Sequence, residues 1–500
     1  MSTRSYRDAV ECLNSLQSNA AALEAVRASG GRLSEFAIPE MVEYLERIGY
    51  KTEDLNALNV LHITGTKGKG STSAFTDSII REAAPQWKIG LYTSPHLVAV
   101  RERIRVNGQP ISEDEFTKYF FEVWDRLQAN TERKFPSTTV MPGYFRFVTL
   151  MAFHAFLQMK VDATILEVGV GGTYDSTNIV PKPVVTGITA LGIDHVAVLG
   201  KTLKDIAWQK GGIYKEGVPA LTVNQPPDGM EVLQQRAQEL KASSFTVVPL
   251  LPGLSDIKLG LAGSHQLQNA NLAAHLAHEF LAAKGVVEKD SDVLSPPVVH
   301  GLQKARWPGR CQTVQDPKHP VTWYLDGAHT LESLDCCMQW YTSPGWWRIP
   351  GLSVQAKPSR VLIFNCTSGR AGPSFLGTML AKVSAQLKLH EREGESVASF
   401  FDHVIFCANV TYADGGFKGD LTTKAIPESD LAELKTQQQL ASAWRELAPD
   451  FPADNVHVLP SIEHAVKIVR SSGASQVLVT GSLHLVGGVI EVAGLSDVAL

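Results

Sequence analysis

The sequence predicts an α/β protein with two domains, a P-loop NTPase-like domain on a parallel sheet followed by a smaller Rossmann-like α/β domain. Two observations predict this class. Apolar runs of strand length alternate with helical patterns over residues 60–241 and again over residues 321–480, which is typical of parallel α/β sheets. Between the two series, the Pro/Gly/Arg-rich stretch Pro296–Arg310 interrupts the helical pattern. We therefore expect domains over 1–305 and 306–500.

The composition is that of a large globular protein. The 500 residues carry 19% charged side chains and a formal net charge of −5, which gives no electrostatic reason to expect nucleic acid or an anionic membrane as a partner. The six cysteines show no C-x-x-C spacing, which favours buried thiols over zinc or disulfides. No apolar run reaches membrane-spanning length, and the N-terminus resembles no signal peptide. We expect a cytoplasmic protein without integral membrane association.

The first domain is organised around Leu61–Ser73, LHITGTKGKGSTS. An apolar strand ends in a glycine-rich loop, and a helical pattern follows, so backbone N–H groups and the helix N-terminus can face a phosphate. Lys69 is expected on the β- and γ-phosphates, with a loop hydroxyl on Mg²⁺. An ordinary glycine-rich loop is the alternative, since Gly70 separates Lys69 from Ser71. The loop residues expected to bind are Gly65, Thr66, Gly68, Lys69, Gly70, Ser71 and Thr72.

The other elements of the first domain follow from periodicity. Ser112-x-x-Glu115 is a capping box, and a helix that is apolar all round is expected to be buried with its His154. Arg101–Asn107 is either a short strand or a solvated face. Expected helices cover Tyr6–Ala28, Ile38–Ile48, Ser112–Leu127, Tyr144–Leu157, Leu203–Gly211, Gly229–Lys241 and a stretch from Gly263; expected strands cover Lys88–Tyr92, Val161–Leu166, Val184–Thr189 and Val218–Val223.

Polar side chains follow three of these strands. Ser94 stands in TSPHL, Glu167 ends the strand Val161–Leu166, and Asp194-His195 follows the strand Val184–Thr189. Ligands of open α/β sheets bind at such strand ends, and Mg²⁺ prefers oxygen ligands beside phosphates. The alternatives are a Ser-Pro turn, a capping aspartate and a packing histidine.

The second domain repeats the pattern of strand, polar tip and helix. The strand Val321–Leu325 ends at Asp326-Gly-Ala-His329, with Arg310 just before it and Ser482 and His484 after the last strand. The remaining expected strands are Val361–Asn365, His403–Cys407, Val456–Leu459 and Val477–Thr480; the expected helices are Leu331–Tyr341, Ser374–Leu389, Asp430–Leu447 and Ile462–Arg470; long loops are expected at Ser343–Ser359 and Asn409–Ala425.

Motifs along nearly the whole chain carry a resemblance to a known family. They are TGTKGKGST (Thr64–Thr72), TSPHLV (Thr93–Val98), RERIRVNG (Arg101–Gly108), PGYFRFVT (Pro142–Thr149), EVGVGG (Glu167–Gly172), NIV (Asn178–Val180), LGIDH (Leu191–His195), AWQKGGI (Ala207–Ile213), GSHQLQNA (Gly263–Ala270), WPGR (Trp307–Arg310) and YLDGAH (Tyr324–His329). Together they resemble the folylpolyglutamate synthases of the Mur-ligase superfamily, in their eukaryotic form. The resemblance weakens at 343–359, at 408–429 and in the first forty residues, so nothing functional is carried there.

The resemblance implies an ATP-dependent amide ligase that adds L-glutamate to the γ-carboxylate of a reduced folate through an acyl phosphate. It implies two Mg²⁺ ions, one held by Ser94 and Glu167 and a second by His195 and a carbamylated Lys210, and it allows a monovalent cation such as K⁺. Lys69, His195 and Lys210 would be catalytic. Asn269 would contact adenine, Arg310 and Asp326 the nucleotide, and His329 the ATP or glutamate site.

Further expectations accompany this resemblance. The partners are the small molecules ATP, reduced folate and L-glutamate; the protein is a monomer, with a mitochondrial form or peripheral mitochondrial association beside the cytoplasmic one. The active site would lie between the domains and be completed by closure. For Lys210 the alternative is a surface lysine whose amine reaches solvent.

Two other functions stay open at this point. A dihydrofolate synthase, which joins glutamate to dihydropteroate, shares most of these motifs. A P-loop switch protein would use ATP only to change conformation, but it has no need of the second carboxylate and imidazole tip or of the Asp326–His329 motif.

Overall fold

The computed structural model describes residues 4–18, 35–343, 358–366, 372–392, 395–422 and 432–500. The chain forms two compact units. The first comprises Met1–His96, Val100–Gly260 and Gln266–Arg306, and the second comprises Leu97–Ala99, Leu261–His265 and Trp307–Leu500. The later part of the expected helix Tyr6–Ala28, most of the loop Ser343–Ser359, the end of the loop Asn409–Ala425 and the start of the helix Asp430–Leu447 lie outside the described residues.

The first unit is built on a mixed sheet with the strand order β4-β3-β2-β5-β1-β6-β7-β8. Six strands run parallel from β2 to β8, whereas β3 is antiparallel to β2 and β4 to β3. The predicted parallel sheet is therefore confirmed, with two short antiparallel strands added at this edge. The bounds are β1 Val60–Thr64, β2 Ile89–Tyr92, β3 Ile104–Val106, β4 Gln109–Pro110, β5 Ala163–Glu167, β6 Val185–Ile188, β7 Pro219–Thr222 and β8 Ser244–Val247.

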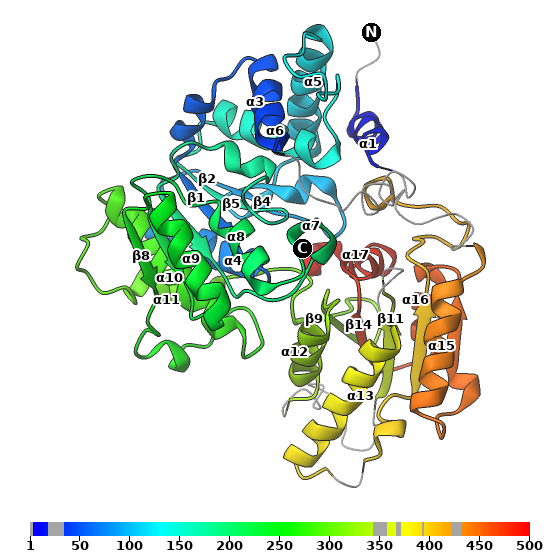
Figure 1. Ribbon diagram of the computed structural model, residues 1–500. Coiled ribbons are helices and arrows are strands. Elements are labelled where there is room, and N and C mark those ends of the chain that lie inside the picture. The colour runs from blue at the N-terminus through cyan, green and yellow to red at the C-terminus, as the bar shows by residue number, and fades with distance from the viewer. Residues whose placement is uncertain (1–3, 19–34, 344–357, 367–371, 393–394, 423–431) are drawn as a thin grey trace. The chain divides into compact units, whose positions relative to one another are not determined.

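Helices lie on both faces of this sheet (Figure 1). The capping box of α5 forms as predicted, with the Ser112 side chain accepting from the Glu115 N–H and the Glu115 carboxylate accepting from the Ser112 N–H. The helices are α1 Tyr6–Ser15, α3 Ala37–Arg47, α4 Lys69–Ala83, α5 Glu113–Ala129, α6 Tyr144–Met159, α7 Val196–Leu199, α8 Leu203–Gly211, α9 Pro227–Glu239, α10 Gln266–Ala283 and α11 Pro296–Lys304, with short 3₁₀ segments at Thr52–Leu58, Val100–Arg103, Ser176–Ile179 and Leu254–Asp256.

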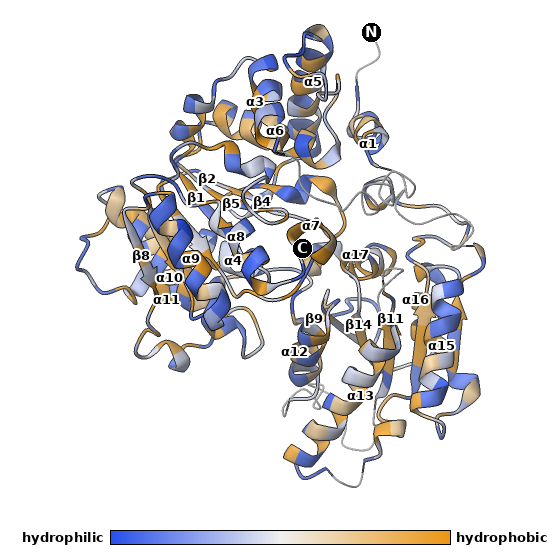
Figure 2. Cartoon of the chain, in the orientation of Figure 1, coloured by the Kyte–Doolittle hydropathy of each residue, from blue (hydrophilic) through white to orange (hydrophobic). Residues whose placement is uncertain are grey.

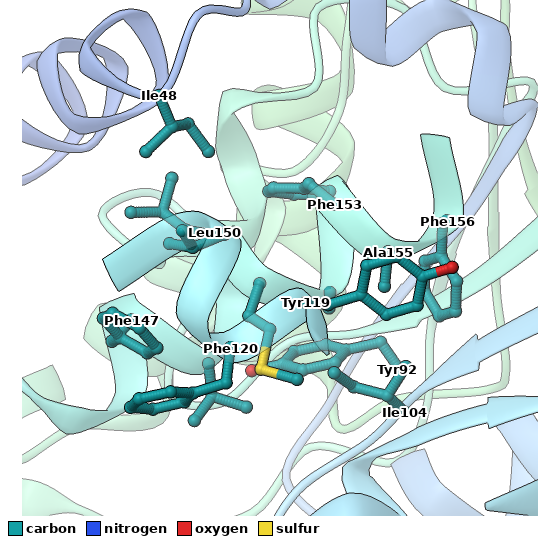
Figure 3. Packing of buried hydrophobic residues seen from close by; sticks show 14 of the residues in the cluster. Ile48, Tyr92, Ile104, Tyr119, Phe120, Phe147, Leu150, Phe153, Ala155 and Phe156 are labelled. Carbon is teal, nitrogen blue, oxygen red and sulfur yellow. The ribbon is translucent and has the colours of Figure 1, made fainter. Parts of the chain in front are cut away.

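A dense aromatic core holds α5 and α6 against the sheet (Figure 3). The rings of Phe120 and Phe147 lie 4.8 Å apart between centroids, and Tyr92 of β2 joins the same cluster. His154 of α6 is fully buried, as predicted, and its two ring nitrogens bond the Tyr50 hydroxyl at 2.8 Å and the Glu122 carboxylate at 2.6 Å. Its role is to complete a polar contact inside an apolar helix bundle.

The predicted interruption at Pro296–Arg310 is wrong for its first part, which forms α11. Pro296 and Pro297 occupy the first helical positions, where the missing N–H costs nothing and the fixed φ favours the helix. The Ser78 hydroxyl of α4 donates to the Gly301 carbonyl at 2.8 Å. The unit boundary follows after Arg306, once this helix has packed on α4.

The second unit holds a six-stranded sheet in the order β13-β12-β11-β14-β10-β9. Its strands are parallel except β9, which pairs antiparallel with β10 and was not predicted. The elements are β9 Gln312–Gln315, β10 Val321–Leu325, α12 Leu331–Tyr341, β11 Ser359–Phe364, α13 Gly372–Leu389, β12 His403–Cys407, α15 Lys435–Leu447, β13 Val456–Leu459, α16 Ile462–Ser471, β14 Ser475–Thr480, α17 Leu483–Val492 and α18 Ser496–Ala499, with 3₁₀ segments at Val397–Ser399, Gly419–Leu421 and Ala453–Asn455.

Hydrophilic residues lie on the outer helices, and the central strands of the second sheet are buried. Outer helices such as α9 and α15 carry long hydrophilic stretches (Figure 2), whereas β10, β11 and β14 are buried over most of their length. Among the described helices, none combines the length and apolar character that crossing a bilayer would need.

Candidate functional site

The carboxyl ends of β1, β5 and β6 meet in the first unit. Ile63 of β1 pairs with Glu167 of β5, and Thr64 pairs with Ile188 of β6. The register therefore places Glu167 beside Ile63, two residues before the loop residue Gly65. This is the edge at which ligands bind in parallel α/β sheets.

Close packing against its neighbours fixes the glycine-rich loop. Gly65 has φ +150°, and a Cβ there would lie 1.8 Å from the Thr189 hydroxyl; Gly68 has φ +88°, and a Cβ there would lie 2.1 Å from the Asn269 Oδ1. Only glycine fits either position. The Thr189 hydroxyl also donates to the Lys67 carbonyl at 2.6 Å. The loop is held in a shape in which α4 begins at Lys69.

Two lysine amines converge on one carbonyl of this loop. The Lys69 Nζ donates to the Gly65 carbonyl at 2.9 Å, and the Lys210 Nζ of α8 donates to the same oxygen at 2.8 Å. Lys210 is only 3% exposed, so the alternative of a surface lysine is wrong. Burial, and then the charge of Lys69, holds the pKa of Lys210 well below its usual value. Burial therefore favours the neutral form of this amine over the charged form.

A buried carboxylate lies at the next strand end. Glu167 is 3% exposed, and its Oε2 accepts the Ser94 N–H at 3.0 Å, so this bond ties the loop after β2 to the tip of β5. The buried Thr72 hydroxyl of α4 has no hydrogen-bond partner in the part of the chain that the structure describes. An oxygen-rich donor set with an unsatisfied hydroxyl fits Mg²⁺. No cluster of three His, Cys, Asp or Glu ligands occurs among the described residues, so such an ion would complete its shell with phosphate and water oxygens.

Asp194 and His195 follow β6, at the third of the strand ends for which polar site residues were predicted. The Asp194 carboxylate lies 3.4 Å from the Lys67 Nζ and accepts the His195 N–H at 2.8 Å. His195 has a left-handed backbone (φ 51°), precedes α7 and is exposed. Its imidazole therefore stands at the rim of this edge rather than inside the fold.

An amide chain links α10 to the start of α4. The Asn269 amide donates to the Gln266 Oε1 at 2.9 Å, and the Gln266 amide donates to the Ser71 hydroxyl at 3.3 Å. Gln266 is fully buried and Asn269 is 6% exposed. Asn269, predicted to contact adenine, and its neighbour Gln266 thus lie against the phosphate loop.

The second unit contains the remaining predicted residues. The Asp326 carboxylate accepts backbone N–H groups from Cys311 at 2.7 Å and from Ala328 at 2.8 Å. The Arg310 Nη1 donates to the Gly309 carbonyl at 3.2 Å, and the His329 Nδ1 contacts the Gly327 carbonyl at 2.8 Å. Asp326 therefore holds the backbone around the tip of β10.

A pocket of about 580 Å³ opens on the first unit between α7 and α8. The Tyr174 and Trp208 rings lie 6.4 Å apart in its wall. Its lining residues are Tyr174, Val196, Ala197, Val198, Leu199, Gly200, Lys201, Asp205, Trp208 and Gln209. No described residue donates a hydrogen bond to the buried Oε1 of Gln209.

Sequence reasoning missed several residues that shape this site. Thr189 at the end of β6 and Lys67 inside the loop both hold the loop by hydrogen bonds. A polar residue ending an apolar strand was the available signal for Thr189. Trp208 stands in the AWQKGGI motif, but only Lys210 of that motif was given a role, and Tyr174 lies outside the quoted motifs.

Comparison with known proteins places the chain among related sequences and structures. It is 44% identical over 508 aligned residues to the folylpolyglutamate synthase of Saccharomyces cerevisiae strain YJM789, covering 99% of this chain and 88% of that protein. The Mycobacterium tuberculosis folylpolyglutamate synthase complexed with ADP and AMPPCP matches with TM-score 0.66 and 24% identity over 94% of this chain and 98% of that one. A structure of an FPGS–AMPPCP–folate complex matches with TM-score 0.59 and 21% identity, covering 95% and 99%. No family model matches the sequence.

Proposed function

This chain belongs to the folylpolyglutamate synthase family, and from that premise we propose that it is an ATP-dependent ligase that joins L-glutamate to the γ-carboxylate of a reduced folate or of its shorter polyglutamates. One observation carries the proposal. Two lysine amines, an orphaned hydroxyl and a buried carboxylate gather around the glycine loop where three parallel strands end.

The reaction needs activation because a carboxylate is a poor acylating agent. An oxygen of the γ-carboxylate attacks the γ-phosphorus of ATP, the bond to the β-phosphate oxygen breaks and ADP leaves. The glutamate amine then attacks the acyl carbon, loses a proton, and phosphate leaves with the former carboxylate oxygen. Both steps build negative charge that positioned cations and N–H donors stabilise.

Residues of the first unit supply that stabilisation. We propose that the N–H groups from Gly65 to Thr72 bind the phosphates, because α4 begins there and its N-terminus favours anions. The Lys69 amine, now on the Gly65 carbonyl, would exchange that bond for phosphate oxygens. Asn269, which lies against Gly68, is proposed for adenine.

Metal binding is proposed at two points of the same edge. Ser94 and Glu167 would hold one Mg²⁺, and His195 with a carbamylated Lys210 would hold a second. Bound Mg²⁺ would neutralise charge on the transferring phosphoryl group. A monovalent cation such as K⁺ is a further candidate ligand.

The carbamate on Lys210 follows from charge. A bare ammonium would repel a metal ion at His195, whereas a carbamate offers two anionic oxygens. Its formation requires a neutral amine, and burial lowers the pKa of Lys210 in that direction.

For the second unit we propose a share in nucleotide and glutamate binding through Arg310, Asp326 and His329. The Asp326 carboxylate acts at least through the loop it holds, since both of its oxygens accept backbone N–H groups. We further propose a monomer that acts in the cytoplasm, with a mitochondrial form.

A labelled-glutamate assay tests the function and its two alternatives. The purified chain is incubated with ATP, Mg²⁺, labelled L-glutamate and either tetrahydrofolate or dihydropteroate. Incorporation with tetrahydrofolate alone supports the proposal. Incorporation with dihydropteroate supports a dihydrofolate synthase, and no incorporation with either supports an ATP-dependent switch.

A further inference from the structure

Arg103 of the first unit is a buried arginine for which the described residues provide no acidic partner within ion-pair distance. It is 9% exposed, and within the described chain its guanidinium makes one hydrogen bond, from Nε to the His96 Nδ1 at 2.9 Å. The carbon of the guanidinium also lies 5.4 Å from the centre of the Tyr144 ring. Neither contact neutralises the charge, because the bonded imidazole nitrogen accepts as a neutral group and the aromatic ring carries only a quadrupole.

Arg81 and Arg105, by contrast, each lie within ion-pair distance of a carboxylate. The Arg81 Nε lies 2.8 Å from the Asp77 carboxylate, and Arg105 Nη2 lies 3.9 Å from Glu102. Buried charges are ordinarily paired in this way, because removing an ion from water is costly. Arg103 departs from that rule, and its Nη1 and Nη2 are not among the buried atoms that lack a partner. Solvent, and hence a ligand, can reach these two donors.

Backbone hydrogen bonds fix Arg103 next to the end of β2. Its carbonyl accepts the Thr93 N–H at 3.1 Å, and the following residue, Ile104 of β3, pairs with Tyr92 of β2. Thr93 directly precedes Ser94, whose N–H is bonded to Glu167. The backbone of Arg103 is therefore tied to the segment that carries Ser94, and its guanidinium bonds His96, which lies two residues after Ser94 in the chain.

The substrate of the proposed function brings an anion that this cation fits. A folate ends in a glutamate residue with two carboxylates, and only the γ-carboxylate reacts. The α-carboxylate stays charged a few bonds away and must also leave water when the site closes around ATP. The planar fork of an arginine matches a carboxylate with two parallel hydrogen bonds.

We propose that Arg103, oriented by His96 and Tyr144, binds the α-carboxylate of the terminal glutamate of the folate substrate. This inference rests on the proposed function. It makes Arg103 a specificity-determining residue that favours a folate over dihydropteroate, because dihydropteroate has a single carboxylate and nothing to occupy the guanidinium.

The test compares two substrates with two enzyme forms. One substrate is tetrahydropteroylglutamate, and the other carries 4-aminobutyrate in place of the terminal glutamate, which keeps the reacting carboxylate and removes the α-carboxylate. Arg103→Met should lower kcat/KM for the first by about 10²-fold or more, as for loss of a charged hydrogen-bond pair in a buried site. The same substitution should change kcat/KM for the second substrate by less than about 3-fold, as for the loss of a neutral contact.

Controls separate this role from a structural one. Arg126→Met removes an arginine of α5 that donates to the Ile48 carbonyl and should leave the ratio of the two substrates unchanged. Arg103→Lys should recover part of the loss with the first substrate. Thermal unfolding and ATP affinity of Arg103→Met should match those of the parent chain.

Several results would overturn the assignment. Equal losses with both substrates would place Arg103 on the reacting carboxylate or the phosphates, and a raised KM for free L-glutamate alone would place it on the incoming substrate. If Arg103→Met fails to fold, the test uses the parent chain alone. Its kcat/KM should be higher for the first substrate than for the second by about 10²-fold. Equal kcat/KM values for the two substrates would refute the proposal. If the parent chain ligates neither substrate, the proposed function itself is wrong. That outcome is distinct from one in which the chain ligates both substrates but Arg103 does not discriminate between them.

Discussion

The strand tips of the two units carry similar polar residues in different states. In the first unit the buried Lys210 amine donates to a neutral carbonyl, that of Gly65, and the Thr72 hydroxyl finds no hydrogen-bond partner among the described residues. In the second unit the Asp326 carboxylate accepts two backbone N–H groups from residues around its own strand end. The first tip is incomplete without a ligand, whereas the second is completed by its own backbone.

This difference separates two uses of the same motif. A buried charge without an opposite charge costs stability unless something else compensates it, and such groups gather at functional sites. A carboxylate saturated by backbone N–H groups instead stabilises the loop that carries it. Substitutions at the first tip should therefore cost mainly activity, and those at the second tip should also cost stability.

The largest effect is expected at Glu167. Glu167→Gln keeps the shape and one acceptor for the Ser94 N–H but removes the charge, so turnover should fall by about 10²- to 10³-fold with folding intact. Calorimetric titration should show a matching loss in the Mg²⁺ dependence of ATP binding. Glu122→Gln, on the carboxylate that bonds His154, is the control and should remain active. Near-normal turnover of Glu167→Gln at saturating Mg²⁺ would remove this carboxylate from the site.

The second-largest loss of turnover is expected at Lys210. Lys210→Ala should lose about 10- to 100-fold in turnover, as for a missing ligand position, and regain part of it with added formate or acetate. Lys210→Arg should stay inactive because its charge cannot be neutralised. Lys204→Ala, on the same helix and paired at 3.0 Å with Glu231, serves as the control. Full activity of Lys210→Arg would show that the position needs a cation, and the carbamate would be refuted.

Asp326 tests the other side of the comparison. Asp326→Asn leaves one of the two N–H groups without its acceptor, so the second unit should lose about 1.5 kcal/mol of unfolding free energy, measured by hydrogen exchange of β10 and β14 amides. The KM for ATP should rise more than that for the folate. Asp335→Asn, at the ion pair with Lys382, should change neither. A raised KM for ATP with unchanged protection would mean that this carboxylate serves the ligand and not its loop.

His62 of β1 shows the smallest effect, on stability alone. Burial lowers the pKa of His62 to about 3, while the unfolded chain keeps about 6.5. As pH falls below 6.5, the unfolded state binds a proton that the folded state does not, so stability is lost with falling pH. Between pH 7 and pH 5.5 the parent chain should lose about 1 kcal/mol more than His62→Gln. Parallel pH profiles in urea unfolding would show that His62 is charged in the folded protein.

The sequence predicted the elements that carry strong periodicity and the polar strand tips. Val321–Leu325 and Leu203–Gly211 have the predicted bounds. Each of these patterns is bounded on both sides by a glycine, proline or polar residue, so its ends could be predicted. β9 and β8 were missed, since short edge strands bury few side chains and give a weak pattern. The helix at Pro296–Lys304 was read as a break because its two prolines suit a first helical turn as well as a loop.

The burial and the long-range contacts of the site residues could not be predicted from the sequence. Glycine spacing predicted the phosphate loop, but the contact of Gly68 with Asn269 depends on α10, about 200 residues later in the chain. Arg101–Asn107 left a strand and a solvated face equally open, and only the pairing of β3 with β2 shows that Arg103 is buried. Burial and pairing across distant segments are set by packing, which local periodicity does not encode.

The central claim is that the first unit activates a folate carboxylate by phosphorylation. Tetrahydrofolate labelled with ¹⁸O in its γ-carboxylate is ligated with ATP and glutamate, and the released phosphate is analysed by mass spectrometry. The account predicts one ¹⁸O atom in each phosphate for every glutamate added, because the carboxylate oxygen leaves with the phosphoryl group. Phosphate free of ¹⁸O, with glutamate still incorporated, would contradict it.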